Sequence, residues 1–144
     1  PLVCVGDDRE RPRLEEYANK LRAPVEFKGR VSLQDLIKLY QKCSFYITAS
    51  KWEGFGLPVI EAGACGKPVI VPRNTAHVEL VRDHRTGFIF NDSSGLMSSA
   101  RFLIGAPQCY RQEIGINARE HIKKKFNLDK TAKDYIDVYK DLVS

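Results

Sequence analysis

The sequence predicts an α/β fold in which helices cover both faces of a parallel sheet and the C-terminal part of the chain is helical. Short apolar segments typical of strands alternate with segments of helical periodicity as far as Phe90. Strands that alternate with helices in this way are joined by right-handed crossovers and run parallel. From Ser93 onward the pattern is helical, with Pro107 separating one helix from the next.

The predicted strands are short and mostly apolar. They are Leu2–Val5, Val25–Gly29, Phe45–Ala49, Pro68–Pro72 and Thr86–Phe90. The fourth is almost entirely apolar, which is typical of a parallel strand with both faces covered. Ligands of such sheets bind beyond the carboxyl ends of the strands. The segments expected around that crevice are Asp7, Lys28–Val31, Ser50–Leu57 and Pro72–Ala76.

The helices between these strands carry apolar residues on one face. In the first they are Leu14, Tyr17, Ala18 and Leu21. Ser32 is the expected N-cap of the next helix, with Asp35 in the capping-box position. The side chains that this helix is expected to bury are Leu33, Leu36, Ile37 and Tyr40. A short helix is expected over His77–Val81, and the final helix has an apolar stripe of Tyr135, Ile136, Tyr139 and Leu142.

The composition is ordinary for a globular protein, with 43% hydrophobic and 28% charged residues. No apolar run approaches the roughly 18 residues of a membrane span, and the first residues lack the layout of a signal peptide. The net charge of +5 and a pI near 9.1 are compatible with anionic nucleotides or acidic lipid. The four cysteines are widely spaced, so we expect them to be small hydrophobic residues whose thiols stay reduced. Reduced thiols are typical of the cytoplasm, and we therefore expect a cytoplasmic protein.

A chain of 144 residues most naturally forms one domain, which here covers residues 1–144. The first residues already have the pattern of a strand, and the chain does not start with methionine. We therefore expect a fragment of a longer protein.

The candidate site is a glycine-rich turn, Glu53-Gly54-Phe55-Gly56, between a strand and a helix. Pro58 suits the first turn of that helix because its φ is fixed and its missing N–H would have had no partner there. A strand, a glycine turn and a helix in this order direct free backbone N–H groups at a ligand, and the helix dipole favours an anion. Glu53 and Glu61 flank the turn. Because carboxylates repel phosphate, they are expected to bind neutral hydroxyls beside it, and a sugar nucleotide has both groups.

The chain resembles a known family over this segment, which reads Glu53-Gly-Phe-Gly-Leu-Pro-Val-Ile-Glu61-Ala-Gly-Ala-Cys-Gly-Lys-Pro-Val-Ile. It is similar to the signature of retaining glycosyltransferases of the two-domain GT-B type, in the glycosyl transferases group 1 family. Further matches in register are Val25–Val31, Leu36–Tyr40, Glu79–Val81 and Thr86–Phe88. The resemblance implies a Rossmann-like, donor-binding C-terminal half of such an enzyme.

The resemblance also implies roles for individual residues. Glu61 would accept hydrogen bonds from the ribose hydroxyls, and Glu53, the implied catalytic residue, would hold hydroxyls of the transferred sugar. The turn Gly54–Leu57, which includes Phe55 and Gly56, would meet the sugar or the diphosphate through its N–H groups. The base would lie against Lys28–Val31, with Lys28, Arg30 and Val31 contributing mostly main-chain atoms. Glu79 would support the donor loop, and His77 in that loop is a candidate contact to phosphate or hydroxyl.

The implied reaction is transfer of a hexose with retention of configuration, from a donor such as GDP-mannose or UDP-glucose to a glycan, lipid or small-molecule acceptor. A mannosyltransferase is one such enzyme. No cofactor and no obligatory metal are implied, since helix N–H groups and basic side chains would stabilise the leaving diphosphate. The acceptor would bind to an N-terminal domain that precedes this chain.

Two features depart from the family pattern. Thr75-Ala76 stands where the family usually has two glycines, and side chains there would crowd the donor phosphate. The phosphate-binding Arg and Lys of the family precede Pro1. The isolated chain is therefore expected to bind a donor weakly and to transfer nothing.

Other interpretations remain open from the residues alone. The same fold could be a non-catalytic nucleotide-binding or scaffold domain, or a nucleotide-sugar epimerase. Trp52, beside the turn, either stacks on a sugar or covers the core. The three histidines have no metal-ligand spacing. The basic run Arg119–Lys125 is either a solvated helix face or a peripheral membrane contact, and it lacks the interleaved aromatic residues of a nucleic-acid site.

Overall fold

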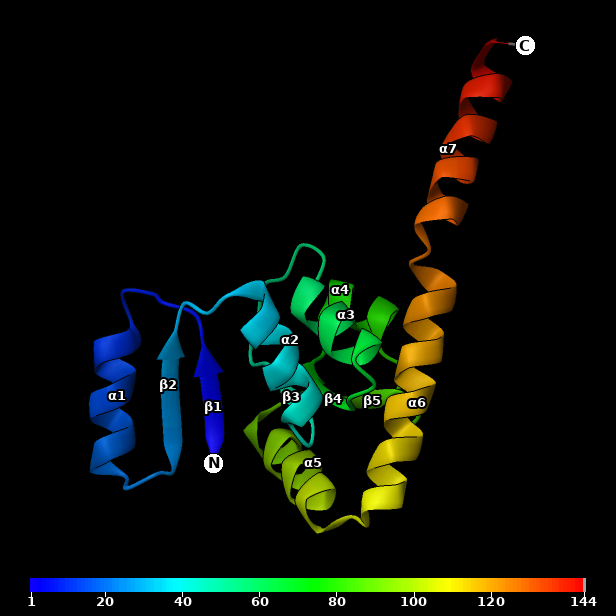
Figure 1. Ribbon diagram of the computed structural model, residues 1–144. Coiled ribbons are helices and arrows are strands. Elements are labelled where there is room, and N and C mark those ends of the chain that lie inside the picture. Colours follow the sequence, from blue (N-terminus) through cyan, green and yellow to red (C-terminus); the bar gives the residue numbers. More distant parts are fainter. Residues whose placement is uncertain (144) are drawn as a thin grey trace. The chain divides into compact units, whose positions relative to one another are not determined.

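The computed structural model describes residues 1–143, which divide into two compact units, Pro1–Leu39 and the described residues from Tyr40 onward. Parallel strands flanked by helices, followed by a helical C-terminal part, confirm the predicted α/β class (Figure 1). We expected the strands in one sheet; among the described residues they form two parallel sheets, one in each unit.

The first unit contains β1 (Leu2–Val5), α1 (Arg11–Lys20), β2 (Val25–Gly29) and most of α2 (Leu33–Lys42). β1 pairs with β2 in parallel. The predicted N-cap of α2 is confirmed, because Ser32 Oγ accepts from the Asp35 N–H at 3.1 Å. The Asp35 carboxylate accepts from the Ser32 hydroxyl at 2.7 Å, whereas in a capping box it would accept from the Ser32 N–H. The hydrogen bond donated by the Ser32 hydroxyl, followed by the hydrogen bond and the charge of Lys38, lowers the pKa of Asp35.

The sheet of the second unit has the parallel order β3 (Tyr46–Ile47), β4 (Val69–Pro72) and β5 (Gly87–Phe90). β4 is central, and its Val69, Ile70 and Val71 are at most 2% exposed, which confirms the prediction of a strand covered on both faces. β3 is shorter than predicted. Its chain bends after Thr48, whose Oγ1 accepts the Ser50 N–H at 3.2 Å.

Five helices complete the described part of this unit: α3 (Leu57–Ala64), α4 (Thr75–Leu80), α5 (Ser93–Gly105), α6 (Gln108–Lys125) and α7 (Leu128–Val143). On one face of the sheet, Leu103 of α5 packs with Ile70, Phe88 and Phe90. Because successive side chains of a strand point to opposite faces, Val69 lies on the other face, under α3 and α6.

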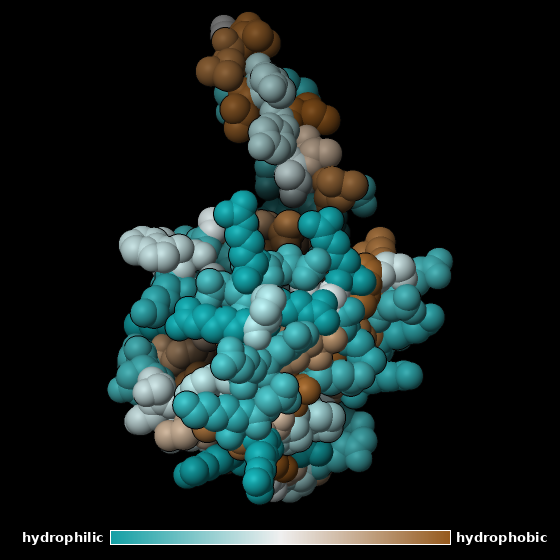
Figure 2. All heavy atoms as spheres, turned by 90° about the vertical axis from the view of Figure 1, so that its left-hand side faces the viewer, coloured by the Kyte–Doolittle hydropathy of each residue, from teal (hydrophilic) through white to brown (hydrophobic). Residues whose placement is uncertain are grey.

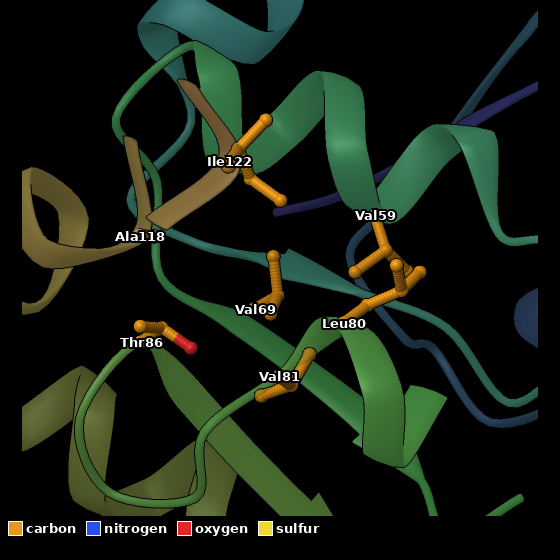
Figure 3. A pocket seen from close by; sticks show the side chains of 8 residues that line it. Val59, Val69, Leu80, Val81, Thr86, Ala118 and Ile122 are labelled. Atoms are coloured by element: carbon orange, nitrogen blue, oxygen red, sulfur yellow. The ribbon is translucent and has the colours of Figure 1, made fainter. Parts of the chain in front are cut away.

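A small cavity of about 10 Å³ lies between α3, α6 and β4, with the side chains of Val59, Val69 and Ile122 around it (Figure 3). Its lining is apolar apart from Thr86. A space of that volume holds at most about one water molecule. It is therefore a packing defect of the core and not a ligand site.

One prediction of a buried helix face is wrong. In α2 only Tyr40 is buried, while Leu33 and Ile37 are exposed. α7 buries none of its described residues, and its apolar side chains face outward in Figure 2. Helical periodicity identifies an apolar face, but whether another element covers that face depends on tertiary contacts. None of the helices within residues 1–143 has both the length and the apolar character needed to cross a bilayer.

Candidate active site

The glycine turn joins β3 to α3, and its backbone conformation is set by Gly56. This residue is the N-cap of α3 with a φ of +87°, a left-handed conformation that glycine adopts without strain. Its carbonyl oxygen accepts from the N–H groups of Val59 at 3.0 Å and Ile60 at 3.2 Å. Within the described chain, the N–H groups of Phe55, Gly56 and Leu57 have no acceptor. The turn therefore presents a row of free donors at the positive end of a helix.

The two glutamates that flank the turn have different surroundings. Glu53 is half-buried, and its Cγ would lie 3.6 Å from a Cβ built on Gly56, so its side chain lies against the turn. Glu61 is exposed on α3 and accepts a hydrogen bond from the hydroxyl of Tyr40 at 3.0 Å. Neither carboxylate forms an ion pair within residues 1–143, so most of the lone pairs on their oxygens are available to a ligand.

Asn74 connects the loop after β4 to the loop after β3. Its Oδ1 accepts the His77 N–H at 2.8 Å and caps α4, while its Nδ2 donates to the Ser50 carbonyl oxygen at 3.2 Å. The Ser50 hydroxyl in turn donates to the Trp52 carbonyl oxygen at 2.9 Å. These hydrogen bonds hold two loops together at the carboxyl edge of the sheet, next to the glycine turn.

His77 packs beneath the glycine turn. Its ring is fully buried, and its Cδ2 would lie 3.5 Å from a Cβ on Gly56. Nδ1 lies 3.1 Å from the Pro72 carbonyl oxygen, which can only accept, so Nδ1 carries the proton. Nε2 is then an acceptor, and it is buried without a partner in the described chain.

The C-terminal end of α6 contacts both the glycine turn and α4. The Phe126 ring contacts the Phe55 ring edge to face, with centroids 5.6 Å apart. Lys125 Nζ donates to the Glu79 carbonyl oxygen at 2.6 Å, while no hydrogen bond of the Glu79 carboxylate occurs within residues 1–143. Phe55 and Glu79 are therefore both held by α6, from a part of the sequence without any recognised motif.

The residues predicted to line the base are Lys28, Arg30 and Val31. They belong to the first unit. Lys28 forms an ion pair with Glu26, with 2.5 Å between Nζ and Oε1. Arg30 is exposed and Val31 is half-buried. Of the predicted site residues, Gly54, Phe55, Gly56 and Leu57 form one turn, and the side chains of Glu53 and His77 lie against Gly56. Glu61 lies further along α3 and Glu79 lies on α4, in the same unit.

Sequence reasoning missed Tyr40 and Phe126 as site residues, and it missed the N-cap formed by Asn74, which lies in the Pro72–Ala76 segment expected around the crevice. Asn74 had a usable signal, since asparagine is a preferred N-cap, but the helix was predicted to start later. Tyr40 was assigned only to the apolar face of its helix. Trp52 is 92% exposed, which excludes the interpretation that it covers the core.

Residues 1–143 contain no group of three or more His, Cys, Asp or Glu side chains placed to share a metal ion. Glu53 lies against the turn, and Glu61 follows the free N–H donors on α3. The site as described thus combines backbone donors for an anion with carboxylate acceptors for hydroxyls.

The family model described as "Glycosyl transferases group 1" matches residues 1–105. The chain belongs to this family. An uncharacterized glycosyltransferase of Methanocaldococcus jannaschii is 31% identical over 141 residues, which are 96% of this chain and 40% of that relative. The family predicted from the Glu53–Glu61 segment is thereby confirmed, and the chain spans well under half of this relative's length.

Solved structures confirm the GT-B type of fold. Sucrose-phosphate synthase from Thermosynechococcus elongatus matches with a TM-score of 0.85 and 28% identity, over 99% of this group 1 chain and 38% of the synthase. Anabaena HepE, in complex with UDP-glucose, matches with a TM-score of 0.84 and 23% identity, over 96% of this chain and 40% of HepE. The second likeness concerns the fold alone.

Proposed function

We propose that this chain is the donor-binding domain of a retaining glycosyltransferase that uses a nucleotide-diphosphate sugar. The observation that carries the proposal is the turn itself. Free N–H groups at Phe55, Gly56 and Leu57 lie at the positive end of α3, with Glu53 before them in the sequence and Glu61 after them. A diphosphate between two hydroxyl-bearing sugars matches this order of donors and acceptors.

In the proposed site Glu61 accepts hydrogen bonds from ribose hydroxyls, and Glu53 holds hydroxyls of the transferred hexose. The free N–H groups of the turn bind the diphosphate and stabilise the charge that develops on it as the glycosidic bond breaks. Glu79 supports the donor loop, and the buried His77 lies beneath the turn and supports it. No step requires a metal or a cofactor in this scheme.

The donor in this proposal is a nucleotide-diphosphate hexose such as UDP-glucose or GDP-mannose. The complex of HepE with UDP-glucose supports the donor class, because a protein of this fold binds such a molecule. The acceptor, a glycan, lipid or small molecule, binds to a separate domain, so the isolated chain transfers nothing. We place the protein in the cytoplasm, with the basic end of α6 as a candidate peripheral membrane contact.

The test is the Glu61→Ala variant of the full-length protein. Loss of hydrogen bonds to a charged acceptor is expected to weaken donor binding by about ten- to a hundredfold, measured by isothermal titration calorimetry. Glu120→Ala, which removes an exposed glutamate of α6, is the matched control and keeps the wild-type affinity. An unchanged donor affinity in Glu61→Ala would refute the ribose assignment.

A second candidate, a scaffold domain that no longer binds nucleotide, rests on Thr75-Ala76. Thr75 is the exposed first residue of α4, so its side chain lies at the edge of the donor loop. Titration of the wild-type protein with UDP, GDP and ADP separates the two candidates. A donor domain gives saturable binding with one of them, whereas a scaffold gives none at millimolar nucleotide.

A further inference from the structure

Tyr40 holds one oxygen of Glu61, although it lies in a different helix. The hydroxyl of Tyr40, in the last turn of α2, donates to Glu61 Oε2 at 3.0 Å. The Tyr40 ring is only 8% exposed, and it contacts the Tyr46 ring edge to face with centroids 5.9 Å apart. A buried ring in a fixed contact gives its hydroxyl a defined position, and Glu61 itself is exposed. The hydrogen bond therefore orients the glutamate rather than the tyrosine.

The chemistry of this pair leaves Glu61 ready to accept another donor. The hydroxyl of a tyrosine can donate one hydrogen bond, and Tyr40 donates it to Glu61 Oε2. Oε1 has no hydrogen-bond partner within residues 1–143. Since tyrosine is neutral, it orients the carboxylate without cancelling its charge, whereas a lysine or arginine would neutralise it and occupy more of its lone pairs. Burial, followed by the charge of Glu61, raises the pKa of Tyr40, so the phenol stays protonated and remains a donor.

We propose that Tyr40 is a positioning residue for donor binding: it fixes the Glu61 carboxylate so that Oε1 accepts a hydrogen bond from a ribose hydroxyl. This inference rests on the proposed function, in which Glu61 binds the ribose. Without the Tyr40 hydroxyl, Glu61 samples several rotamers on the surface of α3, and ordering it for the ribose costs conformational entropy. The hydroxyl thus serves recognition of the ribose and not the chemistry of transfer.

The test compares the wild-type full-length protein with Tyr40→Phe and Tyr46→Phe. Each variant removes one hydroxyl from a half-buried or buried ring, and Tyr46 touches Tyr40 but has no hydrogen bond to Glu61. Affinities are measured for UDP, GDP and ADP and for their 2′-deoxy and 3′-deoxy forms. Tyr40→Phe is expected to bind the best ribonucleotide about tenfold more weakly, and to lose most of the preference for ribose over one deoxyribose form.

Tyr46→Phe is expected to keep the wild-type preference. The ratio of the affinity for the ribonucleotide to the affinity for its deoxy form is informative even if Tyr40→Phe is partly unfolded. An unfolded fraction lowers the number of binding sites but leaves this ratio unchanged. With an acceptor present, Tyr40→Phe should raise the donor KM about tenfold and change kcat less than twofold.

Two results would overturn the inference. One also refutes the proposed function, and the other refutes only the role of Tyr40. If the wild-type protein binds none of the nucleotides, the proposed function fails and the role of Tyr40 fails with it. If Glu61→Ala weakens binding but Tyr40→Phe keeps the full preference for ribose, the donor site stands and only the role of Tyr40 is refuted.

Discussion

The phenyl ring of Phe55, in the glycine turn, meets the ring of Phe126 edge to face, with the ring planes at 90° and the centroids 5.6 Å apart. Phe126 is the C-cap of α6, and the ammonium group of the preceding Lys125 lies 5.6 Å from the centroid of its ring. Lys125 also donates to the carbonyl oxygen of Glu79 at the end of α4. The end of α6 thus contacts the turn and the donor loop together.

We expect Phe126→Leu to weaken donor binding because the turn loses the ring that supports Phe55. Edge-to-face aromatic pairs contribute about 0.5–1.5 kcal/mol beyond their buried area. A double-mutant cycle with Phe55→Leu, read from urea unfolding, should give a coupling energy in that range. Phe102→Leu, which removes a ring in a different edge-to-face pair on α5, is the control and should show no coupling to Phe55.

The glycines of the turn are expected to differ in their tolerance of alanine. At Gly56 a Cβ would lie 2.9 Å from Leu80 Cδ1, and the φ of +87° is unfavourable for alanine, so Gly56→Ala should lose about 1–3 kcal/mol of unfolding free energy and weaken donor binding. At Gly54 a Cβ meets nothing within 4 Å. Gly54→Ala should keep the wild-type unfolding midpoint, and equal losses in the two variants would show that the left-handed conformation is not required.

Helix α6 passes close to the turn after α3, and glycine allows this approach. A Cβ on Gly115 would lie 2.0 Å from the Gly66 carbonyl oxygen, so Gly115→Ala must displace backbone, at a cost of about 1–3 kcal/mol in urea unfolding. Gly105, at the end of α5, has nothing within 4 Å of its built Cβ. Gly105→Ala is therefore expected to be neutral or to stabilise by up to about 1 kcal/mol. A stable Gly115→Ala protein would contradict the close packing.

Stability should fall as the pH drops below about 6.5, the usual pKa of histidine in an unfolded chain. Burial lowers the pKa of His121, and the charges of Arg82 and Lys125 lower it further, while its Nε2 is buried without a partner in the described chain. Between the folded and the unfolded pKa only the unfolded state binds the proton, so acid favours unfolding.

His121→Gln removes this titration, and its unfolding free energy should change less between pH 7.5 and pH 5.5 than that of the wild type. His84→Gln, which removes an exposed imidazole, serves as the control and should keep the wild-type difference. Identical pH dependence of the wild type and His121→Gln would contradict the prediction.

The fold class and family could be predicted because their signals are local. The apolar Pro68–Pro72 segment, the N-cap at Ser32 and the glycine turn after the third strand each depend on residues close together in sequence. Burial of helix faces could not be predicted in the same way. The apolar stripes of α2 and α7 have clear periodicity, yet their exposure depends on whether another element packs against them.

The sequence by itself determined the α/β class, the family and the order of groups along the turn, with Glu53 before the free N–H donors and Glu61 after them. These features follow from neighbouring residues, whose backbone geometry is largely local. Only the tertiary structure decided that Tyr40 holds Glu61, that Asn74 joins two loops and that Phe126 supports Phe55. Such contacts join residues far apart in the chain, and which of them form depends on the packing of the whole unit around β4.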